Sequence, residues 1–149
     1  MKYLLIIFAW TFSTFGTVNG QDIPVSQVPD AVINSFSEDF SNARDVEWER
    51  ESGYFEVDFE TGWGRDHEAR YDESGMLLYH KEEIRNRELP EIVRDKIRSE
   101  YNDYNIDDAE RIIEGDETRY LISLDSRRLS DLDLLIDDKG VIISEAYDD

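Results

Sequence analysis

The chain has 149 residues with 36 Asp and Glu against 16 Lys and Arg, and its formal net charge of -20 repels phosphate backbones, which excludes nucleic acid as a partner. It contains no cysteine and only two histidines, which rules out disulfides, thiolate metal sites and a cysteine nucleophile. Because 40% of the residues are hydrophobic and 12% are aromatic, we interpret the chain as a folded domain with an acidic surface.

The N-terminal segment has the pattern of a secretory signal peptide. The positive charge of Lys2 is followed by an uncharged apolar stretch over residues 3–15, and small side chains precede Gln21. The alternative is a membrane anchor, but polar residues dilute the run after Trp10, and about 20 apolar residues are needed to cross a bilayer. We therefore predict a signal peptide over residues 1–20 and no stable membrane insertion after its cleavage.

The rest of the chain matches itself, first at an offset of 61 residues. Residues 28–32 (VPDAV) correspond to residues 89–93 (LPEIV), with a proline at the expected start of a helix in both segments. Apolar residues then recur four positions apart, which predicts one buried stripe on an amphipathic helix in each segment. These stripes are Val32, Phe36 and Phe40 in the first segment and Val93, Ile97 and Tyr101 in the second.

Alternating apolar and polar residues follow each predicted helix, and the offset between the two segments becomes 65. We assign the four additional residues to the connection over residues 102–108. In the first segment the alternation and the turn at Gly75 predict strands over residues 45–51, 54–60, 65–72 and 76–82. The predicted fold is therefore α+β, a tandem repeat of a helix packed on a four-stranded antiparallel sheet, with one repeat over residues 21–86 and the other over residues 87–149.

Several strings of residues carry a family resemblance. They are residues 28–36 (VPDAVINSF), 46–49 (VEWE), 53–59 (GYFEVDF) and 71–78 (YDESGMLL). This pattern resembles the β-lactamase-inhibitor-like, PepSY-like exported domains of Bacteroidetes, over nearly all of residues 24–147. The resemblance implies tandem units of a helix and a four-stranded antiparallel sheet, and an activity of binding or inhibiting another exported protein.

Candidate metal and catalytic groups have simpler interpretations. The acidic turns 72–75 and 137–140 lack the ligand spacing of a calcium loop, so we interpret them as hairpin turns. His67 and His80 lie in neighbouring predicted strands, and a metal site there would need a third ligand such as Glu68 or Glu82. A further acidic cluster is interpreted as a solvated loop; it consists of Asp103, Asp107, Asp108 and Glu110. We predict no metal, no cofactor and no catalytic residues.

The most informative candidate surface is the strand face that points away from the first predicted helix. If Phe55, Val57 and Phe59 face that helix, the intervening acids face the other way, beside a Trp in a Gly-Trp-Gly turn. Trp and Tyr are frequent interface hot spots, and acids beside them select a basic partner surface. The predicted partner-binding residues are Tyr54, Glu56, Asp58, Glu60 and Trp63. The alternative for Trp63 is packing over the sheet edge or on the second repeat.

From these observations we expect an exported protein, periplasmic or extracellular in a Gram-negative bacterium, that is not an enzyme. Its predicted function is that of a protein-binding or inhibitor-like module, whose partner is an exported protein or peptide with a basic surface. The alternative function is that of an envelope domain that senses or binds a small ligand or cation.

Overall fold

The computed structural model describes residues 21–62 and 64–147. The predicted signal peptide, residues 1–20, lies outside the described residues. The strands are β1 (Gln21–Asp22), β2 (Arg44–Glu51), β3 (Tyr54–Thr61), β4 (Arg65–Tyr71), β5 (Leu77–Glu83), β6 (Asn105–Glu114), β7 (Glu117–Asp125), β8 (Leu132–Asp137) and β9 (Ile142–Tyr147). The helices are α1 (Asp30–Asp39) and α2 (Glu91–Glu100), each preceded by a short 3₁₀ turn, η1 (Val25–Gln27) and η2 (Asn86–Glu88). None of the described helices has the length and apolar character to cross a membrane.

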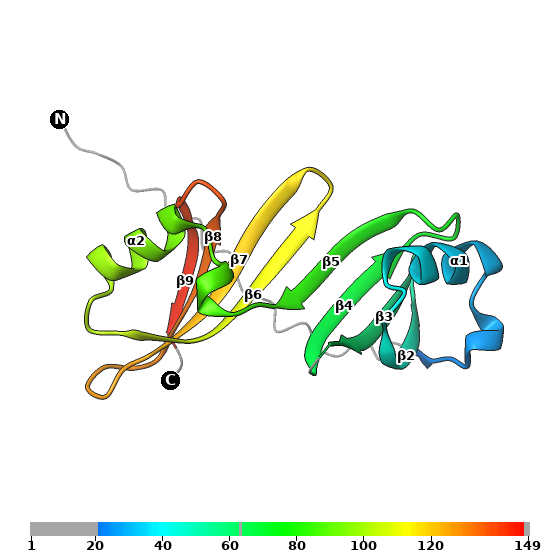
Figure 1. The fold of residues 1–149 in the computed structure, drawn as a ribbon, viewed down its shortest axis with the longest axis horizontal. Coiled ribbons are helices and arrows are strands. Elements are labelled where there is room, and N and C mark those ends of the chain that lie inside the picture. The colour runs from blue at the N-terminus through cyan, green and yellow to red at the C-terminus, as the bar shows by residue number, and fades with distance from the viewer. Residues whose placement is uncertain (1–20, 63, 148–149) are drawn as a thin grey trace.

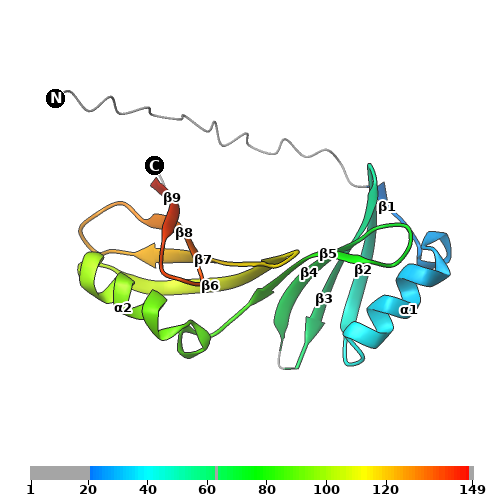
Figure 2. The same cartoon turned by 90° about the horizontal axis from the view of Figure 1, so that it is seen from above.

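All nine strands form one antiparallel sheet in the order of the sequence, from β1 at one edge to β9 at the other (Figure 1). Both helices lie on the same side of this sheet, near its opposite ends (Figure 2). The sheet bends so that the edge strands β1 and β9 lie on the side away from the helices. Within residues 21–62 and 64–147, no helix covers the other face of the sheet.

The predicted fold class was wrong in its central feature. We expected a helix packed on a four-stranded sheet in each repeat, but the described chain is mostly one nine-stranded antiparallel sheet with only two short helices. The two halves join because β5 pairs with β4 on one side and with β6 on the other, from Tyr79 opposite Glu114 to Glu83 opposite Glu110. Alternation of apolar residues predicts strands, but it does not reveal which strand edges will pair.

The order of a helix followed by four strands occurs in both halves, and each helix buries its predicted stripe. Val32 and Phe36 of α1 and Val93 and Ile97 of α2 are buried. Each helix contributes to its own apolar cluster. The first contains Ile23, Val28, Val32, Phe36, Trp48, Phe55, Val57, Phe59, Ala69 and Tyr71. The second contains Ile84, Leu89, Val93, Ile97, Ala109, Tyr120, Ile122, Leu124, Leu132, Leu134 and Ile136.

The four additional residues of the second half lie in a different place from the one we predicted. The connections from α1 to β2 and from α2 to β6 have equal lengths, since both begin after a helix end and end five residues later at Arg44 and Asn105. The β6–β7 hairpin instead has two more residue pairs before its turn, Ile113 opposite Thr118 and Glu114 opposite Glu117. The insertion therefore lengthens a hairpin and leaves the position of α2 on the sheet unchanged.

A buried carboxylate holds the junction between the halves on the helix side. Glu82 of β5 is only 6% exposed and accepts a 2.9 Å hydrogen bond from Nε of Arg111 on β6. Its second oxygen lies 3.4 Å from the guanidinium of Arg65 on β4, which also binds Glu88 at 2.8 Å. Because a buried carboxylate needs compensating charges, we interpret these arginines as the groups that compensate Glu82 where β4, β5 and β6 meet.

Two histidines extend the first apolar cluster toward this junction. His67 is 8% exposed, and its Nδ1 lies 3.0 Å from Nε2 of His80 while its Nε2 lies 2.7 Å from Oγ1 of Thr61. The imidazole of His67 stacks on Phe59, with ring centroids 4.8 Å apart. Burial, with the neighbouring His80, lowers the pKa of His67 from 6.5 to about 4. The native protein therefore holds this ring neutral.

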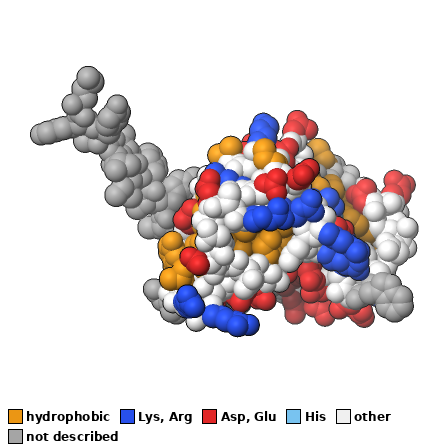
Figure 3. All heavy atoms as spheres, turned by 60° about the vertical axis from the view of Figure 1, so that its left-hand side comes forward, with side chains coloured by type: hydrophobic (Ala, Val, Ile, Leu, Met, Phe, Trp, Pro, Cys, Tyr) orange, Lys and Arg blue, Asp and Glu red, His pale blue; other side chains and the backbone are white. Residues whose placement is uncertain are grey.

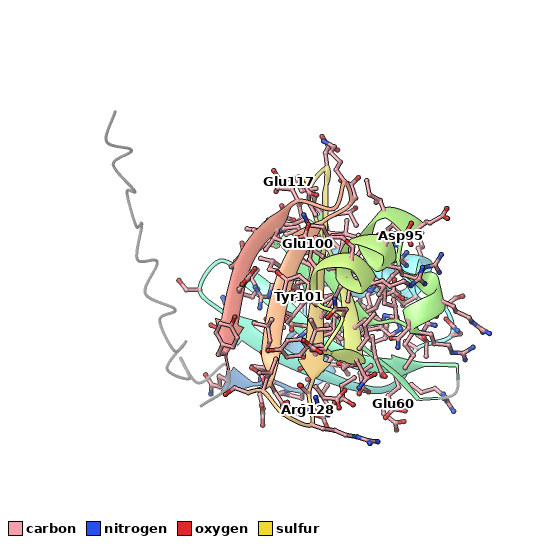
Figure 4. All side chains as sticks on the ribbon, turned by 90° about the vertical axis from the view of Figure 1, so that its left-hand side faces the viewer. Glu60, Asp95, Glu100, Tyr101, Glu117 and Arg128 are labelled. Carbon is pink, nitrogen blue, oxygen red and sulfur yellow. The ribbon has the colours of Figure 1, made fainter. Side chains whose placement is uncertain are left out.

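At the far edge, a tyrosine connects the second helix to the last strand. Tyr101 directly follows α2, and its hydroxyl donates a hydrogen bond to the carboxylate of Glu145 on β9. Figure 4 places Tyr101 between the helix and the end strands. This contact ties β9 to the second half beyond its pairing with β8.

The Glu82→Gln substitution tests the junction. It leaves Arg65 and Arg111 without their shared carboxylate, so we expect the free energy of unfolding to fall by about 2–3 kcal/mol. Urea denaturation measures this change, and Glu83→Gln is the matched control because Glu83 is exposed on the same strand. Equal stability of the two variants would show that the ion pairs do not hold the junction.

The histidine pair predicts a dependence of stability on pH. The pKa of His67 is about 4 in the native state and near 6.5 when unfolded, so protonation favours unfolding as the pH falls below 6.5. We expect His67 to account for a loss of about 2 kcal/mol between pH 7 and pH 5. Urea denaturation of the wild type and of His67→Gln at both pH values measures this loss. The other titrating groups are present in both proteins, so the difference between the two losses is the contribution of His67. An identical loss in the variant would contradict this assignment.

Candidate functional site: the open face of the sheet

The face of the sheet without helices is here called the open face. On β3, Phe55, Val57 and Phe59 are buried in the first cluster on the opposite side. Tyr54, Glu56, Asp58 and Glu60 alternate with them, which puts these four predicted partner-binding residues on the open face. Of the four, Asp58 is exposed and the others are half-buried. Trp63 lies outside the described residues, and partner binding by this set stays a prediction.

A ladder of alternating charges crosses the open face from β3 to β6. Arg70 on β4 donates hydrogen bonds to Glu56 at 2.7 Å and to Glu68 at 2.6 Å. Lys81 on β5 lies 3.1 Å from the other oxygen of Glu68 and 3.6 Å from Glu110 on β6. The ladder therefore passes over the junction between the two halves.

Two tyrosines hold the central arginine of the ladder. The guanidinium carbon of Arg70 lies 5.3 Å from the ring centroid of Tyr54 and 4.5 Å from that of Tyr79, on the flanking strands β3 and β5. Such cation–π contacts stabilise a cation and restrict its orientation. Together, Tyr54, Arg70 and Tyr79 form a patch of aromatic and charged groups on the open face.

The ladder carries more negative than positive charge, and the carboxyl pKa values reflect this. Burial and the neighbouring Glu68 raise the pKa of both Glu56 and Asp58, despite the nearby Arg70. Burial likewise raises the pKa of Glu110. Burial alone would lower the pKa of Lys81, but Glu68 and Glu110 outweigh it and raise that pKa. An additional cation on this face would therefore meet incompletely compensated carboxylates.

Sequence reasoning missed an apolar group beside the ladder. Leu121 on β7 lies directly opposite Leu135 on β8, and both alternate with the buried residues Ile122 and Leu134. Ile112 on β6 is diagonal to Leu121 on the same face. All three side chains are half-buried. The sequence does contain a sign of this apolar group. A strand with one face in water alternates apolar and polar residues, whereas β7 and β8 also have apolar residues at positions that point away from the core.

The other candidate residues do not form a metal site with one another. His67 and His80 lie on the helix side, hydrogen-bonded to each other. In the acidic cluster, Glu110 belongs to the ladder with Lys81. Within the part of the chain that the structure describes, no group of three or more His, Cys, Asp or Glu side chains is placed to hold a metal ion.

In both acidic turns, the first aspartate accepts hydrogen bonds from backbone N–H groups of the same turn. Oδ1 of Asp72 accepts hydrogen bonds from the N–H groups of Ser74 at 2.9 Å and Met76 at 3.0 Å. Asp137 does the same in the second turn. Gly75 has a φ of 87°, and a Cβ there would lie 2.6 Å from the carbonyl oxygen of Ala31 on α1. These residues therefore form turns that pack closely on the helices, as hairpin chemistry predicts.

Exposed apolar side chains also occur at the end of the molecule that carries α2 and β9. They are Ile92, Leu129, Val141, Ile143 and Tyr147. In Figure 3, which brings this end forward, apolar side chains are interspersed with acidic and basic ones. This end therefore offers scattered apolar groups, whereas the open face has an apolar group next to an organised ladder.

Comparisons with known proteins place the fold. The chain is similar to a DUF2874 family protein from Bacteroides uniformis (17% identity, TM-score 0.66, 80% of this chain and 88% of that one). It is also similar to a BLIP-like protein from Bacteroides fragilis (22% identity, TM-score 0.64, 84% and 87%). A third structure, described as a "putative periplasmic" protein from Bacteroides eggerthii, has 15% identity, a TM-score of 0.67 and coverages of 80% and 88%. A comparison with curated proteins gave no match.

A family model described as "putative beta-lactamase-inhibitor-like, PepSY-like" matches residues 16–79 and residues 53–144. These two overlapping matches cover most of the chain. The resemblance inferred from the sequence is therefore confirmed, and the chain belongs to the beta-lactamase-inhibitor-like, PepSY-like family.

Proposed function

We propose that this protein is an exported, non-enzymatic binding module that docks a basic surface of another exported protein on its open face. The observation that carries the proposal is the ladder of Glu56, Arg70, Glu68, Lys81 and Glu110, which lies beside an apolar group on a face that neither helix covers. Protein interfaces generally have an apolar core and a polar rim, and the apolar group with the neighbouring ladder matches this arrangement.

The chemistry of the ladder supports a basic partner surface. Arg70 and Lys81 are already paired, so they are not free to bind an acidic surface. Glu56, Asp58 and Glu110 have raised pKa values, and a Lys or Arg side chain from a partner would lower them by stabilising the charged form. Leu121 and Leu135 would supply apolar contact, which binds more strongly than exposed ion pairs.

The family and the predicted signal peptide support the location and the inhibitor-like role. Among the similar structures, one is described as BLIP-like and another as periplasmic. An inhibitor needs a preformed surface that changes little on binding, and a continuous sheet supplies one. We therefore place the protein in the periplasm or outside the cell, acting by occupying a partner's surface.

Charge reversal on the open face tests this function. We expect Asp58→Lys to weaken the partner's Kd by about tenfold, because it removes an acid and repels the basic surface. Proteins captured from the exported fraction by the wild type are identified, and the affinity of the purified partner is then measured by calorimetry.

Asp138→Lys is the matched control, because Asp138 is exposed in the β8–β9 turn away from the ladder. It should leave the Kd within about twofold of the wild type, and higher salt should weaken the wild-type complex. Capture of the same proteins with equal affinity by wild type, Asp58→Lys and Leu121→Lys would remove the open face as the binding surface.

A further inference from the structure

A groove opens on the helix side of the sheet, between α1 and the edge strand β2. We call it the edge groove; its volume is about 720 Å³, within the range of ligand sites. Apolar side chains line most of it: Ile23, Ile33, Phe36, Val46 and Trp48. Asp22 and Glu47 also border it, but Asp22 lies opposite Glu49 and Glu47 lies opposite Asp58, so their side chains are on the other face of the sheet. It lies apart from the open face and is not used by the function proposed above.

The second half of the chain contains the same structural position, which serves as an internal comparison. The N–H of Ile23 donates to the carbonyl of Trp48 at 2.9 Å, and the N–H of Ile84 donates to that of Ala109 at 2.8 Å. In both halves the chain then leaves the sheet through a 3₁₀ turn and enters a helix. The side chains at matching positions differ: Val25, Ile33 and Val46 in the first half correspond to Asn86, Arg94 and Asp107 in the second.

The polar residues of the second half are used structurally. Nη1 of Arg94 donates to the carbonyl of Arg87 at 3.0 Å, and the amide of Asn86 lies 3.4 Å from the carbonyl of Ile106. The fold is thus built with charged and amide side chains at these positions. The apolar lining of the edge groove is therefore not a requirement of the fold, and Val25 and Val46 are left 55% and 39% exposed.

The strand edge next to the groove has a segment that does not pair with another described strand. In the described part of the chain, β1 pairs with β2 only through Gln21 and Asp22, and the last bond in this direction is the one from Ile23 to Trp48. Among the described residues, no strand pairs with the outer edge of residues 44–47. Backbone donors and acceptors on a free strand edge are the partners that an extended peptide uses.

We propose that the edge groove binds an extended peptide segment in which apolar side chains are flanked by Lys or Arg. The apolar side chain would fill the groove above Trp48 and Phe36, and the peptide backbone would lie along residues 44–47 of β2. Because side chains alternate along an extended peptide, the flanking cations would point to the opposite face of the sheet, toward Asp22 and Glu47. The net charge of -20 likewise disfavours anionic ligands.

The probe is the synthetic peptide acetyl-Lys-Val-Lys-Leu-Lys-amide, titrated calorimetrically into the purified protein. We expect binding to the wild type, and Ile33→Arg should weaken it by about tenfold or more, the equivalent of losing the burial of one aliphatic side chain. This substitution introduces the residue that the second half has at the same position, so the fold is expected to accommodate it. Circular dichroism and thermal unfolding check that it does.

Ile92→Arg is the matched control, because Ile92 is exposed on α2 and the change is chemically the same. It should leave the affinity unchanged, and a peptide with Ser in place of Val and Leu should bind more weakly at equal charge. The absence of binding to the wild type, or equal binding by Ile33→Arg, would overturn the proposal. Loss of binding in Asp58→Lys but not in Ile33→Arg would place the peptide on the open face and also overturn it.

Discussion

The pairing of β5 with β6 is the constraint on which the rest of this structure depends. Without this pairing, β5 in the first half and β6 in the second half would each have an unpaired edge. An exposed strand edge promotes association with other chains. Joining the edges removes both and makes one sheet of nine strands. Ion pairs hold this junction on both faces: Glu82 with Arg111 on the helix side and Lys81 with Glu110 on the open face.

The two faces of the junction have different consequences. On the helix side Glu82 is nearly fully buried, so its arginines compensate a charge that would otherwise be costly. On the open face the groups are half-buried and the acids exceed the bases, which leaves negative potential available to a partner. The same strand pairing thus provides the stability of the fold and the continuity of the surface proposed to bind.

Much of the local structure could be predicted from the sequence, because it depends on periodicity. The stripe of Val32 and Phe36 predicts α1, and the alternation of Phe55, Val57 and Phe59 predicts the two faces of β3. Long-range pairing could not be predicted in this way, since the residues of β5 and β6 do not reveal that their edges meet. The four additional residues of the second half were assigned to the wrong connection for a related reason. The offset between matching positions changes from 61 to 65 somewhere between the helix and the second strand, and the offset alone does not show whether a loop or a hairpin contains the insertion.

The candidate site was predictable only in part. The acids of β3 were found because they alternate with a clear apolar series, but the ladder depends on Arg70 and Lys81 lying beside them on other strands. Leu121 and Leu135 were missed because β7 and β8 have apolar residues on both faces. The sequence pattern therefore did not distinguish the outward-facing residues from the core residues beside them. The edge groove needed the comparison of equivalent positions in three dimensions.

Hydrogen exchange at the junction tests the central claim most directly. If one sheet continues through β5 and β6, the alternate backbone amides that pair between residues 79–83 and 110–114 should exchange as slowly as those of the flanking pairs β4–β5 and β6–β7. Rapid exchange of those amides, with both apolar clusters still protected, would show two independently folded halves and would contradict the account.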